Sequence, residues 1–451
     1  MENWALRKSQ TARIVGTSAP YRLREILAEA RSHVARQRPG ATMAMWQSVG
    51  PDNVPGRIGA LAISRQDSRV LYAGSAAGGV YKSTDGGGRW HALWSQQESL
   101  AVGGLAVAPS TDDVVYVATG EWEDNVSSTP YHHFPGVGVY RTGDGGQTWS
   151  CSTIPSIWTA AVAVDPVNPD RVFVAGDRSL HRSRDGGQTW DAAAGNVHGI
   201  FSGTISDVAI DPGDPQRVYL GVHRSGVWRS TDGGDHWTGL TLPGLAESST
   251  ISPKLTLRPR SVAPPFVAVL TAGLVFTSAD GGDHFTAQES VEAPSYAAWC
   301  TAIAVDPVDE EVLLVGHIKL WRSIRGGQGW TLVGHAAMPP SAGHADQQAI
   351  VFDPRNHDHV YVATDGGVFE SVNNGATWTP RSRGLETTQC YTVAVSRAAP
   401  LRIGITTQDN HVYQSTGGLS FTSILWPSRG AGSTTTRTIR GSSTPTPGGR
   451  R

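Results

Sequence analysis

The chain has 451 residues, including 53 Gly, 27 Pro and 15 Trp, and only 17% of its residues are charged. Its 37 basic and 39 acidic residues leave a formal net charge of −2, which does not indicate nucleic-acid binding. Three widely separated cysteines exclude a disulfide framework and a thiolate zinc site, and no apolar run reaches the ~18 residues of a membrane span. The excess of Gly and Pro is spread along the chain and indicates many turns around a large core.

Residues 1–45 are predicted to form an N-terminal arm with one helix at about residues 20–38. The apolar side chains of this helix share one face: Leu23, Ile26, Leu27, Ala30 and Val34. Glu25 and Glu29 dilute the basic face, which favours a helix that docks on protein over one that lies on a membrane. Residues 1–11 are polar and lack the apolar segment of a signal peptide, so the sequence as written predicts a cytoplasmic chain.

Residues 46–427 are dominated by a repeat of about 45 residues, a period typical of solenoids and propellers. Each copy contains a phrase of the form Ser/Thr-x-Asp-Gly-Gly-x-x-Trp/Phe. The copies lie at residues 83–90, 142–149, 183–190, 230–237 and 278–285, with weaker ones at 323–330, 371–378 and 415–421. Two short β-branched runs precede the phrase, a third leads into it, and the aromatic residue opens a fourth. Four short strands per repeat predict the blades of a β-propeller.

The repeated phrase has a physical reason to recur as a turn. Its two glycines provide the positive φ angles of a tight hairpin, and its Asp accepts hydrogen bonds from the backbone of the turn. The aromatic residue then packs between neighbouring blades. We therefore interpret the Asp of the five strong copies as structural: Asp85, Asp144, Asp185, Asp232 and Asp280.

This phrase resembles the Asp-box, or BNR repeat, of bacterial propellers. That resemblance extends from Trp46 to Phe421 and implies a relationship to sialidases, two-propeller xyloglucanases, the sortilin ectodomain and photosystem assembly factors. The phrases around Trp46, Gly56-Arg57-Ile58 and Gln408-Asp409-Asn410 resemble proteins usually labelled glycosyl hydrolase or sialidase-like. The expected fold is a single all-β propeller of seven or eight four-stranded blades. Eight is preferred because eight repeats are visible. The resemblance indicates the fold specifically but gives almost no information about the activity.

The ends of the repeat array carry two further expectations. Residues 46–49 mimic the last strand of a blade and are expected to close the ring by completing the final blade. Residues 428–451 are rich in Ser, Thr, Gly, Pro and Arg and are predicted to be disordered. The array breaks off after the eighth repeat. The families that this chain resembles are commonly secreted, which leaves the compartment open.

A ligand site is expected on the face opposite the Asp-box turns. The loops between second and third strands and the connections between blades share that face, and they are rich in His, carboxylates and aromatic residues. The predicted ligand-binding residues are Arg57, Trp122, Tyr131, His132, His133, His223, His344 and Asp409. No cofactor is predicted. A metal site at His344 and Asp346 is not predicted either, because no His-x-x-x-His spacing supports it.

The candidate catalytic carboxylates, if the protein is an enzyme, are Glu121 and Asp124 on an inserted loop, with Asp346 or Asp365 opposite. Two carboxylates that face each other are what a glycosidase requires. A sialidase is disfavoured because Gly59 replaces the Pro of its Arg-Ile-Pro phrase and because sialidases have six blades. The resemblance to xyloglucanases implies an Asp at the position of Ala76 and a second propeller, and neither is found.

The main hypothesis from the sequence is a non-catalytic propeller that binds a glycan or a protein partner. The alternative is a glycoside hydrolase of the sialidase-like, BNR type that uses carboxylates on the same face. An enzyme needs two carboxylates in a deep pocket, whereas a binder needs only a shallow surface lined with aromatic side chains. The oligomeric state is left open.

Overall fold

The fold was analysed in a computed structural model of the chain. The structure describes residues 50–94, 97–121, 134–156, 158–177, 179–192, 204–246, 249, 252–258, 264–292, 301–334, 344–396, 402–415 and 417–425. The expected helix at residues 20–38, the strand expected at 46–49 and the C-terminal tail lie outside these residues. Within the described residues, no helix is long and apolar enough to cross a membrane.

Every regular element that the structure describes in detail is a β-strand, and the strands form eight sheets of four. The strands of the first four sheets are β1 (Ile58–Ile63), β2 (Leu71–Ser75), β3 (Gly79–Ser83), β4 (His91–Ala92), β5 (Val102–Val107), β6 (Val115–Thr119), β7 (Val139–Thr142), β8 (Ser150–Ser152), β9 (Thr159–Val164), β10 (Val172–Gly176), β11 (Ser179–Ser183), β12 (Asp191–Ala192), β13 (Ile205–Ile210), β14 (Val218–Val222), β15 (Gly226–Ser230) and β16 (Thr238–Leu240).

The strands of the last four sheets are β17 (Lys254–Arg258), β18 (Phe266–Thr271), β19 (Leu274–Ser278), β20 (Thr286–Ala287), β21 (Ala302–Val305), β22 (Val312–Gly316), β23 (Leu320–Ile324), β24 (Thr331–Gly334), β25 (Gln347–Phe352), β26 (Val360–Thr364), β27 (Gly367–Ser371), β28 (Thr379–Pro380), β29 (Cys390–Val395), β30 (Ile403–Thr407), β31 (Val412–Ser415) and β32 (Thr422–Leu425). Each sheet is antiparallel and keeps its strands in chain order.

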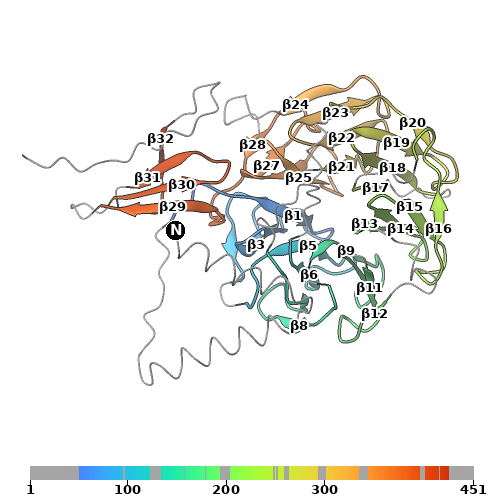
Figure 1. Cartoon of the computed structure of the whole chain (residues 1–451), viewed down its shortest axis with the longest axis horizontal. Coiled ribbons are helices and arrows are strands. Elements are labelled where there is room, and N and C mark those ends of the chain that lie inside the picture. The colour runs from blue at the N-terminus through green and yellow to red at the C-terminus, as the bar shows by residue number, and fades with distance from the viewer. Residues whose placement is uncertain are drawn as a thin grey trace, which may run out of the picture.

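The first strands of seven sheets stand side by side around a central axis. Their neighbour contacts run from β1 through β5, β9, β13, β17 and β21 to β25, and β25 returns to β1. Figure 1 shows these seven sheets around a common centre, with the sheet β29–β32 beside them. The expected all-β propeller of seven or eight four-stranded blades is confirmed, with eight sheets present and seven of them in the closed ring.

The core consists of apolar layers between adjacent blades, because each sheet has two faces and both must be covered. Between the first and seventh blades, for example, Ile58, Leu71 and Trp90 pack against Tyr361 and Val368. The second strand of every ring blade is buried along its whole length, as its unbroken run of Val, Tyr, Leu and Ala predicts.

The eighth sheet is attached to the segment that enters β1. Asn53 Nδ2 donates to the carbonyl oxygen of Phe421 at 3.0 Å, and the amide of Phe421 donates to Asn53 Oδ1 at 2.8 Å. A small cluster of Val54, Ile403, Ile405 and Phe421 covers part of one face. All six residues of β29 are exposed, in contrast to the first strands of the ring, which neighbouring blades cover.

Candidate functional site

The repeated Ser/Thr-x-Asp-Gly-Gly phrases form the turns between third and fourth strands, on one face of the ring. In the third blade, Ser183 Oγ accepts a hydrogen bond from the amide of Gly187 at 2.7 Å and donates one to Asp185 Oδ1 at 2.8 Å. The amide of Thr189 donates to Asp185 Oδ1 at 2.9 Å. The side chains of Asp85, Asp144, Asp232 and Asp280 make equivalent bonds in their own turns. These Asp side chains therefore stabilise their own turns, which lie at one end of the ring.

A buried arginine lies at the opposite end of the central channel. Arg57 immediately precedes β1 and is 8% exposed. Its Nε and Nη2 donate to Asp365 Oδ1 and Oδ2 at 3.0 and 2.9 Å, and its Nη1 donates to Glu121 Oε1 at 3.0 Å. Glu121 follows β6 of the second blade, and Asp365 follows β26 of the seventh. Arg57 thus joins two carboxylates from the blades on either side of it.

Asp365 has hydrogen-bond partners besides Arg57. Gln348 Nε2 on β25 donates to Asp365 Oδ1 at 2.8 Å, and Asn410 Nδ2 donates to the Asp365 carbonyl oxygen at 3.1 Å. These contacts hold the Asp365 side chain in place between the first and seventh blades.

Asp409 lies beside Asp365, in the loop between β30 and β31. Desolvation by the surrounding side chains and the charge of Asp365 raise the pKa of the Asp409 carboxyl above its ordinary range, while Arg57 and His344 oppose the rise. A hydrogen bond to Asp365 contributes in the same direction. Asp409 is an exposed residue, so solvent and ligands can reach it. A raised pKa together with access is what a proton donor needs.

Unusual backbone conformations gather at the same place. Asp346, Asp409 and His411 have φ angles of 61°, 58° and 75°, in the left-handed region that residues other than glycine rarely adopt. The amide of Asp365 donates to the Asp346 carbonyl oxygen at 3.2 Å, which places this strained residue against the carboxylate cluster. Strained backbone of this kind concentrates at functional sites.

The structure thus brings together five of the residues singled out from the sequence, with a sixth beside them: Arg57, Glu121, Asp365, Asp409 and His344, and Asp346 through its backbone. We call this group the channel-mouth cluster. His223 is not part of it: it lies in the fourth blade, between β14 and β15, where its Nδ1 accepts a hydrogen bond from the amide of Ser252 at 3.3 Å. Asp124, Trp122, Tyr131, His132 and His133 lie outside the described residues.

Two members of the site were missed in the sequence. Gln348 is the second residue of β25, which is apolar from Ala349 onward, and the polar pair Gln347-Gln348 is the signal that could have identified it. Asn410 stood in the phrase Gln408-Asp409-Asn410 but was given no role. Among the described residues, no group of three or more His, Cys, Asp or Glu side chains is arranged to hold a metal ion.

Comparisons with known proteins agree with this architecture. No family model matches the chain. It is 23% identical over 206 residues to a xyloglucanase of Paenibacillus sp., a match that covers 44% of this chain and only 16% of that protein. Among solved structures, it resembles the GH74 xyloglucanase from Xanthomonas campestris, with a TM-score of 0.65 and 19% identity over 86% of this chain and 70% of that one. It also resembles a GH74 enzyme of Niastella koreensis, with a TM-score of 0.60 and 20% identity over 83% and 67% of the two chains.

The fold and these comparisons define the class to which the structure belongs. It is a multi-bladed β-propeller with the fold of the GH74 xyloglucanases. At identities this low the likeness establishes the fold and not the activity. The Asp that the xyloglucanase resemblance implies is replaced by Ala76, which is fully buried and immediately follows β2.

Proposed function

We propose that this chain is a glycoside-hydrolase-type propeller whose channel-mouth cluster acts on a polysaccharide, with Asp409 as the proton donor. The observation that carries the proposal is the pairing of Asp409, whose pKa is raised, with the Asp365 carboxyl group that Arg57 and Gln348 hold in place. The likeness of the fold to GH74 enzymes supports the same class of reaction. It favours the glycoside hydrolase alternative over the non-catalytic main hypothesis.

The roles of the carboxylates follow from their contacts. A glycosidase needs one acid that protonates the leaving oxygen and one carboxylate that activates water or attacks the sugar. Asp365 is hydrogen-bonded to Asp409 and occupied by Arg57 and Gln348, so its role is to raise the pKa of the donor. Glu121 lies on the other side of the Arg57 guanidinium and is the candidate for the second carboxylate.

The test is the release of reducing sugar from xyloglucan and β-glucans by the wild type and by Asp409→Asn. We expect the substitution to lower kcat by about 10²-fold or more, because it removes the proton donor but keeps the shape of the side chain. Asp283→Asn, at an exposed carboxylate of an Asp-box turn on the opposite face, is the matched control and is expected to retain full activity. Full activity of Asp409→Asn would overturn the assignment.

The pH profile gives a second readout of the same group. A donor must be protonated, so kcat is expected to fall as pH rises through the raised pKa of Asp409. Replacing Asp365 by Asn removes the neighbouring negative charge, and this alkaline limb is then expected to move to lower pH. An alkaline limb unchanged in Asp365→Asn would contradict the tuning role.

A second candidate is a propeller that binds glycan without cleaving it. Ala76 favours it, because the carboxylate implied by the xyloglucanase resemblance is missing from the first blade. The same polysaccharides, used insoluble in a pull-down, separate the two functions. Retention without release of reducing ends would support the binder and exclude the hydrolase.

A further inference from the structure

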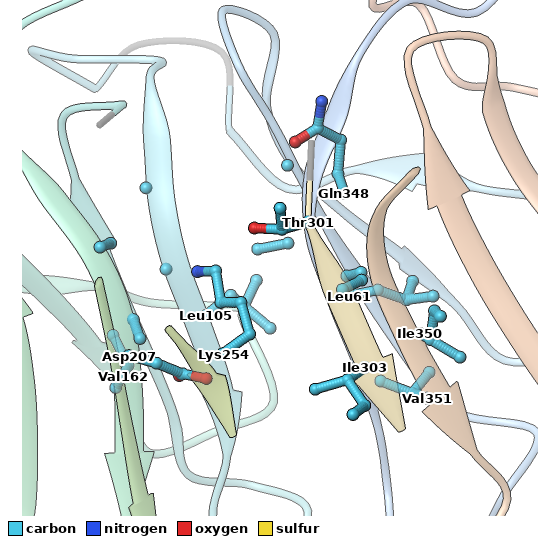
Figure 2. Close-up of a pocket in the computed structure, with 18 of the residues that line it drawn as sticks. Leu61, Leu105, Val162, Asp207, Lys254, Thr301, Ile303, Gln348, Ile350 and Val351 are labelled. Carbon is cyan, nitrogen blue, oxygen red and sulfur yellow. The ribbon is translucent and has the colours of Figure 1, made fainter. Parts of the chain in front are cut away.

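The central channel of the ring contains a space of about 230 Å³ that opens to solvent. All seven ring blades contribute to its wall, through residues on or next to their first strands. Most of the lining is Gly, Ala, Leu, Ile or Val, as at Leu61, Leu105 and Ile350. Figure 2 shows Asp207 and Lys254 on one side of this space and Thr301 and Gln348 on the other. This volume is several times the ~30 Å³ that one water molecule occupies in the liquid, so a small organic molecule fits in the channel.

Two charged residues depart from the pattern of the lining. Asp207 follows the irregularity in strand register at the start of β13. At the corresponding irregularity the first, second, third and seventh blades have Ala60, Gly104, Ala161 and Ala349. Asp207 and Lys254, from the fourth and fifth blades, are the ionisable residues of this lining.

The Asp207 side chain is bound to the backbone of two neighbouring blades. Its Oδ1 accepts from the amide of Val208 at 2.9 Å, and its Oδ2 accepts from the amide of Leu255 at 2.8 Å, which joins the fourth blade to the fifth. Burial raises the pKa of the Asp207 carboxyl, although Lys254 opposes the rise. Asp207 is half-buried and lines the cavity. Both of its carboxyl oxygens are thus engaged by backbone amides.

Within the part of the chain that the structure describes, Lys254 has spare hydrogen-bonding capacity. Its Nζ donates to the carbonyl oxygen of Ser206 at 2.7 Å. An ammonium group has three donors, and this bond uses one of them. The half-buried side chain borders the cavity, where an anion can take the remaining donors.

We propose that the channel is a second binding site, for a small organic monocarboxylate whose carboxylate group meets Lys254 and whose apolar end lies against the aliphatic wall. A charged hydrogen bond fixes the carboxylate, and methylene groups can contact the Leu, Ile and Val side chains of the wall. An acid of roughly two to four carbons suits this volume. This inference does not depend on the proposed hydrolase activity.

Thermal unfolding in the presence of sodium butyrate, acetate or chloride tests it at constant ionic strength. For the wild type we expect a saturable rise in Tm that is largest with butyrate and smallest with chloride. Lys254→Met is expected to weaken the apparent affinity for butyrate about tenfold or more. Lys319→Met, which removes an exposed pair with Glu292, is the control and should respond as the wild type does. Equal effects of butyrate and chloride, or an unchanged response in Lys254→Met, would overturn the proposal.

A structural readout covers the case in which Lys254→Met does not fold. Crystals of the wild-type chain soaked with 4-bromobutyrate are expected to show anomalous density in the channel, with the carboxylate within hydrogen-bonding distance of Lys254 Nζ. An empty channel at saturating concentration would refute the site. Neither measurement uses glycan cleavage, so a failure here is distinct from a failure of the hydrolase proposal.

Discussion

Burial changes the chemistry of a single histidine in the third blade. His181 on β11 is 4% exposed, and its Nε2 lies 2.9 Å from both Ser156 Oγ and Ser179 Oγ. Burial lowers the pKa of His181 to about 4, because the imidazolium form cannot be solvated there. The neutral ring is therefore the form that the fold accommodates.

This histidine is expected to make the protein less stable in mild acid. In the unfolded chain His181 binds a proton below its ordinary pKa near 6.5, whereas in the folded state it does so only below about 4. The unfolded state thus gains protons first, and the free energy of unfolding falls as pH drops from 6.5 to 4, by about 3 kcal/mol for this group. Chemical denaturation of wild type and His181→Gln across this range measures the effect.

The control for that experiment is His236→Gln, at an exposed histidine in the Asp-Gly-Gly turn of the fourth blade. His181→Gln is expected to flatten the pH dependence of stability between 4 and 6.5, and His236→Gln is expected to preserve it. Parallel curves for wild type and His181→Gln would show that another group is responsible.

A comparison of the recurring turns shows which residue of the repeated phrase is kept in every turn between third and fourth strands. In the sixth blade Arg325 replaces the Asp, yet Ser323 Oγ still accepts from the amide of Gly327 at 3.1 Å. In the seventh blade Asn373 accepts from the amide of Thr377 at 2.9 Å, as an Asp would. The Ser or Thr hydroxyl is thus retained where the Asp is not.

We therefore expect Ser183→Ala to destabilise the third blade. The substitution leaves the amide of Gly187 buried without its partner, at a cost of about 1–3 kcal/mol in the free energy of unfolding. Ser150→Ala, at an exposed position of β8, is the control and should change stability by less than about 0.5 kcal/mol. Urea denaturation of both variants compares them, and equal stabilities would contradict the anchoring role of the hydroxyl.

Ring closure is a property of the whole molecule. Trp90 of the first blade is 2% exposed, packs against the seventh blade, and donates from Nε1 to the carbonyl oxygen of Arg381 at 2.7 Å. Trp237 has the equivalent position between the third and fourth blades, but within the described residues its Nε1 has no hydrogen-bond partner. The Trp90 contact, which closes the ring, therefore includes an indole hydrogen bond that the Trp237 contact lacks among the described residues.

Removing Trp90 is accordingly expected to cost more than removing Trp237. Each Trp→Ala substitution loses about 3–5 kcal/mol of stability through its cavity. Trp90→Ala additionally leaves the Arg381 carbonyl oxygen without its donor, which adds about 1 kcal/mol or more. Tm and urea midpoints of the two variants provide the measurement. A larger loss in Trp237→Ala would show that closure does not depend on this contact.

The sequence was sufficient for the strands and turns of this protein. The Asp-Gly-Gly turns and the short apolar runs are local signals, because a turn or a strand face is specified by residues a few positions apart. The same signals predicted which face of the blades holds Arg57, Glu121, Asp365 and Asp409, since strand order in a blade fixes the side on which each loop emerges.

Only the tertiary structure decided which of these elements meet. Eight repeats were visible, but closure of the ring by β1 against β25, with the β29–β32 sheet outside it, depends on contacts some 300 residues apart. The joining of Glu121 and Asp365 through Arg57, and the placing of Asp207 and Lys254 in one channel, arise in the same way. The reason is physical: distances between side chains on different blades are set by the curvature of the closed ring, and no local stretch of sequence contains that curvature.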